Sequence, residues 1–127
     1  LLNLSIATSG NYRKFVERGG KRISHFIDPR TARATNHGAV SASVVHESAV
    51  YADAYAIAMM VLGVEEGLKL AERLGLSVYF IESANGGTLN TKYSSQWSKL
   101  HSKSGRLTSS FAVTLIFFLC FLNLFSF

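Results

Sequence analysis

Asp53 is the residue whose surroundings most clearly suggest chemistry. It lies in the stretch 49–62, which consists almost entirely of alanine, methionine, valine and other apolar residues. A helix formed by this stretch has almost no polar face, so we expect the helix to be buried. A buried carboxylate needs a cation or a hydrogen-bond donor beside it, because burial alone raises its pKa. Asp53 is therefore a candidate ligand, and a polar residue held by nearby backbone is the structural alternative.

A second group that could bind a ligand is a cluster of basic residues near the start of the chain. The net charge is +5, and the basic residues gather towards both ends while the middle is acidic. Gly19-Gly20 predicts a two-residue hairpin turn, because glycine tolerates positive φ, so a solvated hairpin is the simplest interpretation of the charges around it. A phosphate-rich ligand is the functional alternative, and nucleic-acid binding is not expected. The basic residues concerned are Arg13, Lys14, Arg18, Lys21 and Arg22.

The C-terminal end differs in composition from the rest. Residues 107–127 carry no charge and are mostly apolar, which is long enough to span a bilayer, and a basic flank precedes them. That flank predicts a cytoplasmic body by the positive-inside tendency, and a truncated or misjoined gene end is the alternative. Residues 94–106 are Ser-rich and basic and are predicted to form a linker. The single cysteine, Cys120, excludes an intrachain disulfide and a cysteine-based metal site.

Two consecutive helices are predicted to hold Asp53 in place. Ser48 is a suitable N-cap for a helix over 49–62, and Gly63 is suited to end it with a left-handed residue. A second, amphipathic helix is expected over 65–74, closed by Gly75.

Strands are predicted from alternation and from the turn residues between them. Residues 30–39 follow Pro29 and lack any periodicity, so we expect an irregular loop there. Strands are expected where apolar and polar residues alternate, or where a run lies between Gly- and Asn-rich turns. They cover 2–8, interrupted by 9–11, then 12–18 and 21–28 as a hairpin, 40–46, 76–81 and, after a turn at 85–87, 88–93.

Four short motifs follow one another along these elements. They are Ala7 to Tyr12, Ser24 to Thr31, Ala52 to Ala56, and Val61 to Gly63, and the Ser-His-x-Ile-Asp-Pro-Arg-Thr run is the most specific. Their order and spacing resemble the C-terminal half of ApbE-type FAD:protein FMN transferases, over about residues 4–83. The resemblance implies that residues 1–93 are the C-terminal part of a flavin transferase domain. The elements predict an α+β fold, an antiparallel sheet with two packed helices, incomplete without upstream strands.

The resemblance also implies a reaction, the Mg²⁺-dependent transfer of FMN from FAD to a Ser or Thr hydroxyl of an acceptor protein. Breaking the FAD pyrophosphate requires a base for the attacking hydroxyl and a cation to neutralise charge. His25 matches the family's base, and imidazole exchanges protons near neutral pH; a histidine that only bonds within a hairpin is the alternative. Asp53 matches the family's Mg²⁺ carboxylate.

Ile57 departs from the family pattern at the expected metal site. It stands one helical turn after Asp53, where the family usually has a threonine that completes the site. Three alternatives follow. Either the Ile57 backbone carbonyl serves as the ligand, or a water takes the place of the missing threonine hydroxyl, or the metal site has decayed.

The matched motifs also imply contacts with the flavin nucleotide. Ser9 and Gly10 match a turn that approaches the nucleotide, although an ordinary strand-ending turn explains them nearly as well. Phe26 and Ile27 are expected to point in opposite directions, one towards the ligand and the other towards the core. Ala32 replaces a common family glycine, so the loop conformation there is expected to differ.

Three functions stay open at this point. The first is FMN transfer by a complete enzyme, with this fragment inactive on its own; the second is FAD hydrolysis to FMN and AMP, in which water replaces the protein hydroxyl. The third is a non-catalytic, membrane-tethered remnant. The expected partners are FAD, an acceptor protein and a membrane reached through residues 107–127. For location, the resemblance implies the periplasmic face of the inner membrane, whereas the basic flank predicts the cytoplasm.

Overall fold

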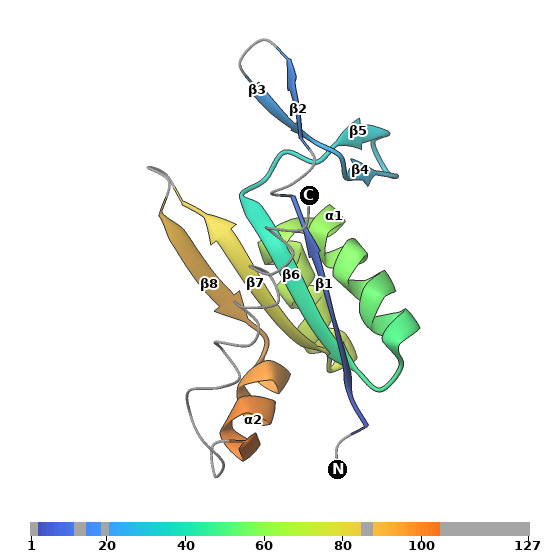
Figure 1. The fold of residues 1–127 in the computed structure, drawn as a ribbon, viewed down its shortest axis with the longest axis vertical. Helices are drawn as coiled ribbons and strands as arrows, with labels where there is room; N and C mark the ends of the chain where they lie inside the picture. Colours follow the sequence, from blue (N-terminus) through green and yellow to red (C-terminus); the bar gives the residue numbers. More distant parts are fainter. Residues whose placement is uncertain (1–2, 12–14, 19–20, 85–87, 105–127) are drawn as a thin grey trace, which may run out of the picture.

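The computed structural model describes residues 3–11, 15–18, 21–84 and 88–104. Its centre is a four-stranded antiparallel sheet in the order β1-β6-β7-β8, with the long helix α1 on one face and α2 at the end of β8 (Figure 1). The expected α+β fold, an antiparallel sheet with packed helices, is confirmed. Two small two-stranded ribbons, β2–β3 and β4–β5, extend from one end of the sheet. The elements are β1 Ser5–Gly10, β2 Phe15–Arg18, β3 Lys21–Ser24, β4 Ile27–Asp28, β5 Arg33–Ala34, β6 Ala39–His46, α1 Ala49–Leu74, β7 Ser77–Ser83, β8 Leu89–Tyr93 and α2 Ser95–Ser104.

Two of the expected strands differ from the structure. β1 continues through Ser9 and Gly10, because both residues still pair with β6, so the break expected at these two residues is wrong. The single strand expected over 21–28 is interrupted, and its first part pairs with β2 as the expected hairpin. The interruption has a local cause: the Ser24 hydroxyl accepts a hydrogen bond from the Phe26 N–H at 3.1 Å, which bends the chain at His25. The expected turns at 19–20 and 85–87 lie outside the described residues.

Helix α1 bends sharply at Gly63, so the two predicted helices are confirmed as two halves of one element. Gly63 has φ 79° and ψ 178°, which is not helical and is open almost only to glycine. Gly75 ends the second half in the left-handed conformation, with φ 65°. Ser48 stands at the N-cap with extended backbone but makes no capping bond with its side chain. Its own N–H instead donates to Nδ1 of His46 at 3.0 Å.

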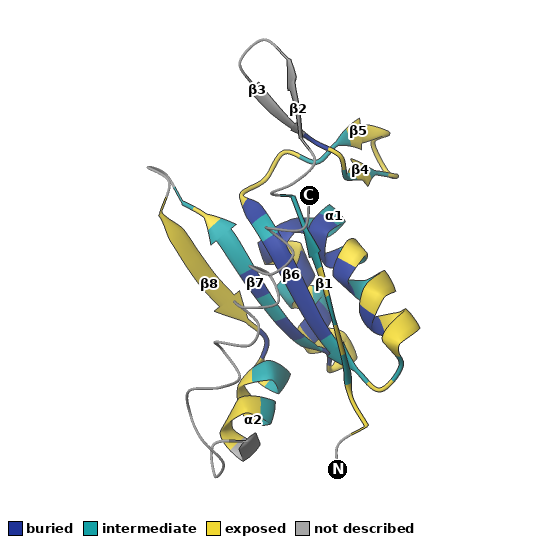
Figure 2. Cartoon of the chain, viewed as in Figure 1, coloured by how far each residue is buried: buried dark blue, intermediate teal, exposed yellow. Residues whose placement is uncertain are grey.

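The core lies between the sheet and one side of α1. Fully buried side chains come from both layers: Ala42, Val44, Val78 and Phe80 from the sheet, and Ala52, Ala56, Met59 and Met60 from α1. Burying a side chain the size of valine, phenylalanine or methionine contributes about 1.5–3 kcal/mol, so this layer accounts for much of the stability. The expectation that the first half of α1 is buried all round is wrong, because its other side is exposed (Figure 2). That side has no covering element within the described part of the chain.

Residues 95–104 form helix α2, where an irregular linker was expected. The helix is held by side chains distant in the sequence. Glu72 of α1 accepts hydrogen bonds from the Ser95 N–H at 2.7 Å and the Ser95 hydroxyl at 2.6 Å, and these bonds lower the pKa of Glu72. The Trp97 ring lies 5.1 Å from that of Tyr79 on β7. Serine-rich composition alone did not indicate a helix, because the contacts that stabilise it are tertiary.

Ser94 joins α2 to the sheet, and we expect Ser94→Ala to lower the free energy of unfolding by about 1–3 kcal/mol. The hydroxyl is fully buried; it accepts from the Val78 N–H at 3.0 Å and donates to the Leu76 carbonyl at 2.7 Å. Alanine would leave both backbone groups buried without a partner. Urea unfolding measures the change, and Ser98→Ala, at an exposed serine of α2, is the matched control. A loss no larger than that of the control would show that Ser94 is not an important link.

No helix within the described ranges is long and apolar enough to cross a membrane. Residues 107–127 lie outside those ranges, so the expected membrane span stays a prediction.

Candidate functional site

His25 lies at the bend between β3 and β4, where its side chain is exposed to solvent. Its ring is 4.2 Å from that of Phe26. Phe26 packs against the hydrophobic core, whereas Ile27 is 54% exposed. A contact of either residue with a ligand stays a prediction. The core contact of Phe26 fixes the backbone on which His25 stands. The arrangement therefore presents the imidazole and the Ile27 side chain at the surface.

Asp53 and Ile57 lie one turn apart on the exposed side of α1, and Ile57 is 44% exposed. The expectation that Asp53 is buried is wrong, because the first half of α1 buries only the side that faces the sheet. Burial therefore gives no reason for a cation beside Asp53.

The carboxylate of Asp53 suits Mg²⁺, but Ile57 does not add a second side-chain ligand. Mg²⁺ keeps several waters and is often held by one or two carboxylates together with substrate phosphates, which an exposed Asp53 allows. Ile57 offers no side-chain ligand. Within the described ranges, no three His, Cys, Asp or Glu side chains gather to hold one ion. Asp53 would therefore act with waters and with phosphates of a bound nucleotide.

Ser9 and Gly10 lie at the end of β1, opposite Ala42 and Ser41 of β6, and both are half-buried. They are strand residues and not part of a turn. The next residue, Asn11, was not among the expected site residues, although it stands in the same motif. Its N–H donates to the Val40 carbonyl at 2.8 Å, but its side-chain Oδ1 is buried and has no hydrogen-bond partner in the described part of the chain. A buried amide oxygen of this kind usually has a hydrogen-bond donor beside it.

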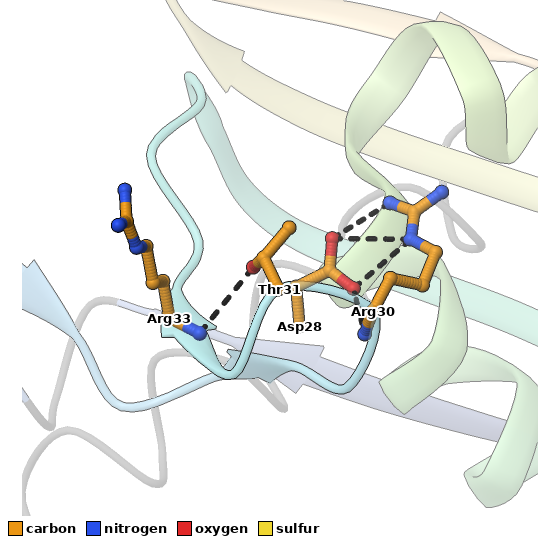
Figure 3. Close-up of polar contacts among 4 residues, drawn as sticks. All are labelled: Asp28, Arg30, Thr31 and Arg33. Atoms are coloured by element: carbon orange, nitrogen blue, oxygen red, sulfur yellow. Dashed lines mark hydrogen bonds and ion pairs between the residues drawn. The ribbon is translucent and has the colours of Figure 1, made fainter.

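The loop after β4 is organised by an ion pair. Arg30 donates to the Asp28 carboxylate from its backbone N–H, from Nε, and from Nη2 at 2.7 Å (Figure 3). The hydrogen bond from the guanidinium lowers the pKa of Asp28. Thr31 accepts the Arg33 N–H at 3.3 Å, and Ala32 between them has φ 54°. At Ala32 the loop therefore has a left-handed conformation that glycine adopts more readily, and a difference from the loop of the family stays a prediction.

This loop and the bend of α1 enclose an open hollow of about 460 Å³. Its wall includes the Asp28–Arg30 pair and Arg33, and its floor includes Val61 and Leu62 of α1. His37 also lines the hollow; its Nδ1 accepts the Ala39 N–H at 3.3 Å, and its ring lies directly over Gly63. His46 is likewise bound to neighbouring backbone, through the hydrogen bond that its Nδ1 accepts from the Ser48 N–H.

Known proteins match this chain over most of its length. Residues 1–80 match the ApbE family. The chain is 44% identical over 92 residues to the FAD:protein FMN transferase of Escherichia coli K12, covering 72% of this chain and 26% of that protein. It is 38% identical over 100 residues to the Haemophilus influenzae protein of the same name, covering 79% of this chain and 29% of that one.

The solved structures agree with the sequence comparison. The apo form of the Pseudomonas stutzeri flavinyl transferase ApbE superposes with a TM-score of 0.69 at 36% identity, covering 77% of this chain and 31% of that one. The Vibrio cholerae flavin transferase ApbE gives a TM-score of 0.63, also at 36% identity, over 76% of this chain and 29% of that one. The chain thus spans between a quarter and a third of the length of these relatives. With residues 1–80 matched and the fold shared, the chain belongs to the ApbE family.

Proposed function

We propose that this chain supplies the C-terminal part of an enzyme that transfers FMN from FAD to a Ser or Thr hydroxyl of an acceptor protein. The observation that carries the proposal is the family match over residues 1–80, which includes the run around His25 and the helix around Asp53. Relatives that share this segment are named FAD:protein FMN transferase. The exposure of both His25 and Asp53 supports it, since a base and a metal ligand that act on a bound nucleotide must be accessible to it.

The proposed reaction exchanges one phosphorus–oxygen bond for another. The acceptor hydroxyl oxygen attacks the phosphorus of the FMN half of FAD, the bond to the bridging oxygen of the pyrophosphate breaks, and AMP leaves with that oxygen. His25 takes the proton of the attacking hydroxyl, and the FMN phosphate ends as an ester of the acceptor side chain. Mg²⁺, when bound, neutralises charge on the phosphate oxygens. Asp53 would contribute the carboxylate that holds the ion, and the Ile57 side chain would contribute no ligand.

Hydrolysis of FAD is the competing reaction, because water can take the place of the acceptor hydroxyl. The exposed position of His25 is compatible with either nucleophile. Release of AMP with no FMN bound to the acceptor would identify hydrolysis. We expect the chain alone to show neither reaction, since only part of the site is present and catalysis depends on fixed relative positions.

The metal role of Asp53 is tested in a completed enzyme, by which we mean residues 1–104 fused behind the upstream portion of the E. coli relative. We expect Asp53→Asn to abolish the Mg²⁺ dependence and most of the activity. Loss of a partner that merely orients a metal ligand typically costs roughly 10- to 100-fold, so losing the ligand itself should cost at least about 10-fold. Ile57→Thr should lower the Mg²⁺ concentration at half-maximal rate, because its hydroxyl lies one turn from Asp53 on the same side of α1.

The measurement is a Mg²⁺ titration of AMP release for the wild type and both variants. The exposed Glu65→Gln substitution, in the second half of α1, removes a carboxylate outside the proposed site and serves as the control. An unchanged Mg²⁺ dependence in Asp53→Asn would remove Asp53 from the metal site.

A further inference from the structure

The hollow between the loop after β4 and the bend of α1 has no role in the proposed reaction. The residues that line it include none of His25, Asp53 and Ile57, all three of which the structure describes. Its volume of about 460 Å³ lies within the range of small-ligand pockets, roughly 300–1,000 Å³. The hollow is therefore large enough to hold an organic molecule of its own.

One positive charge in the hollow has no counter-charge. Arg30 is neutralised by Asp28, whose carboxylate lies 2.7 Å from its Nη2. The Arg33 side chain extends away from that pair (Figure 3), and its guanidinium makes no ion pair or hydrogen bond with any residue that the structure describes. Glu66, whose charge acts on Arg30, is itself bound to Lys69 at 2.9 Å. The uncompensated guanidinium therefore favours an anion in the hollow.

The groups around Arg33 suit the two ends of an organic anion. The side-chain amide of Asn36 has no hydrogen-bond partner within the described ranges, so its N–H groups can donate to a ligand. The Thr31 hydroxyl oxygen accepts the Arg33 N–H at 3.3 Å, which leaves the hydroxyl proton to donate. Val61 and Leu62 of α1 line the floor and are half-buried. A charged head would thus find donors on the wall, and its body would lie on an apolar floor.

Hydrogen bonds within the loop hold these groups in place. The Ala32 N–H donates to the Asp28 carbonyl at 2.8 Å, and the Thr35 N–H donates to the Phe26 carbonyl at 2.9 Å. The Thr35 hydroxyl also donates to the Ser24 hydroxyl oxygen at 3.0 Å. A loop that is already ordered loses little conformational entropy when a ligand binds. The hollow therefore has the character of a preformed site.

We propose that the hollow binds a small organic carboxylate. The carboxylate pairs with the guanidinium of Arg33 and accepts a hydrogen bond from Asn36, and the apolar body of the ligand lies on Val61 and Leu62. A phosphate monoester matches the hollow less well, because it carries up to two negative charges at neutral pH and only one cation is uncompensated. The site is separate from the FMN transfer reaction and does not depend on it.

Titration of the full chain with benzoate, followed by NMR of the backbone amides, tests the site. We expect saturable shifts at Arg33, Asn36 and Leu62, and no shift at Ser98, which is exposed on α2. Benzamide has the same ring without the charge and should bind at least about 10-fold more weakly, because hydrogen bonds between charged groups are the stronger ones. Inorganic phosphate should displace benzoate only at concentrations well above that of benzoate.

A substitution on the wall provides the second arm. Arg33→Gln keeps a long polar side chain without the charge, so we expect benzoate to bind at least about 10-fold more weakly, with an affinity close to that of benzamide. Arg73→Gln removes an exposed arginine at the end of α1, outside the hollow, and should keep the wild-type affinity. Circular dichroism checks that both variants keep the wild-type helix content.

Four results would each overturn the proposal. They are shifts that do not saturate, equal affinities of the wild type for benzoate and benzamide, unchanged benzoate binding in Arg33→Gln, and displacement by inorganic phosphate at the same concentration as benzoate.

Discussion

Replacing His25 with alanine in the completed enzyme is expected to slow FMN transfer by about 10²- to 10⁴-fold, the usual contribution of a positioned general base. FAD binding should change little, because the base acts on the acceptor hydroxyl in the chemical step. The structure supports this separation: Phe26, not His25, makes the contact with the core, and the bend is set by the Ser24 hydroxyl. Removing the imidazole should therefore leave the local backbone in place.

Two measurements separate a base from a structural histidine. Equilibrium binding of FAD and the single-turnover rate of transfer are compared for the wild type, His25→Ala and His37→Ala. The last is the control, since His37 is also exposed but is tied to the Ala39 N–H. An equal loss of binding and rate in His25→Ala would indicate that His25 holds the loop together and does not take part in the reaction.

Gly63→Ala is expected to lower the free energy of unfolding by about 2–6 kcal/mol. Two costs combine. Backbone strain at φ 79° and ψ 178° contributes about 1–3 kcal/mol for a residue with a side chain. The new Cβ would also lie 2.9 Å from Cδ2 of His37, and such overpacking typically costs about 1–3 kcal/mol.

The two costs can be measured separately by urea unfolding. In the double variant Gly63→Ala/His37→Ala the steric clash is gone and the strain remains, so part of the loss should be recovered relative to His37→Ala alone. Gly75→Ala is a control for strain without a clash, because its φ is 65° and no atom lies within 4 Å of the added Cβ. A loss in Gly63→Ala no larger than in Gly75→Ala would show that the bend of α1 does not depend on this glycine.

The parts of the fold that sequence predicted correctly are those determined by local chemistry. Gly63 and Gly75 end the two helical halves because few other residues tolerate their backbone angles. The strands β6 and β7 follow from largely apolar runs, and β8 follows from its place after the turn residues Asn85-Gly86-Gly87. Helix α2 was missed because it depends on Glu72 and Tyr79, which lie distant in the sequence.

For the candidate site, the sequence predicted how far each residue is buried, and in which element it lies, less well than it predicted which residue types to consider. An apolar helix around Asp53 predicted burial, but burial depends on what covers the helix, and only the side facing the sheet is covered. Ser9 and Gly10 were expected in a turn because serine and glycine favour turns, whereas pairing with β6 keeps them in β1. The Asn11 Oδ1, which has no hydrogen-bond partner among the residues that the structure describes, had no signal in the sequence beyond its place after Gly10, since hydrogen bonding depends on the folded neighbours.

The most direct test of the flavin transferase assignment is the appearance of FMN on an acceptor protein. The completed enzyme is mixed with FAD, Mg²⁺ and an acceptor that the intact E. coli relative modifies, and the denatured acceptor is examined by mass spectrometry while AMP is quantified. We expect FMN bound covalently to a Ser or Thr of the acceptor, AMP released in equal amount, and loss of both in His25→Ala. A completed enzyme that binds FAD but leaves the acceptor unmodified, under conditions in which the intact relative modifies it, would contradict the account.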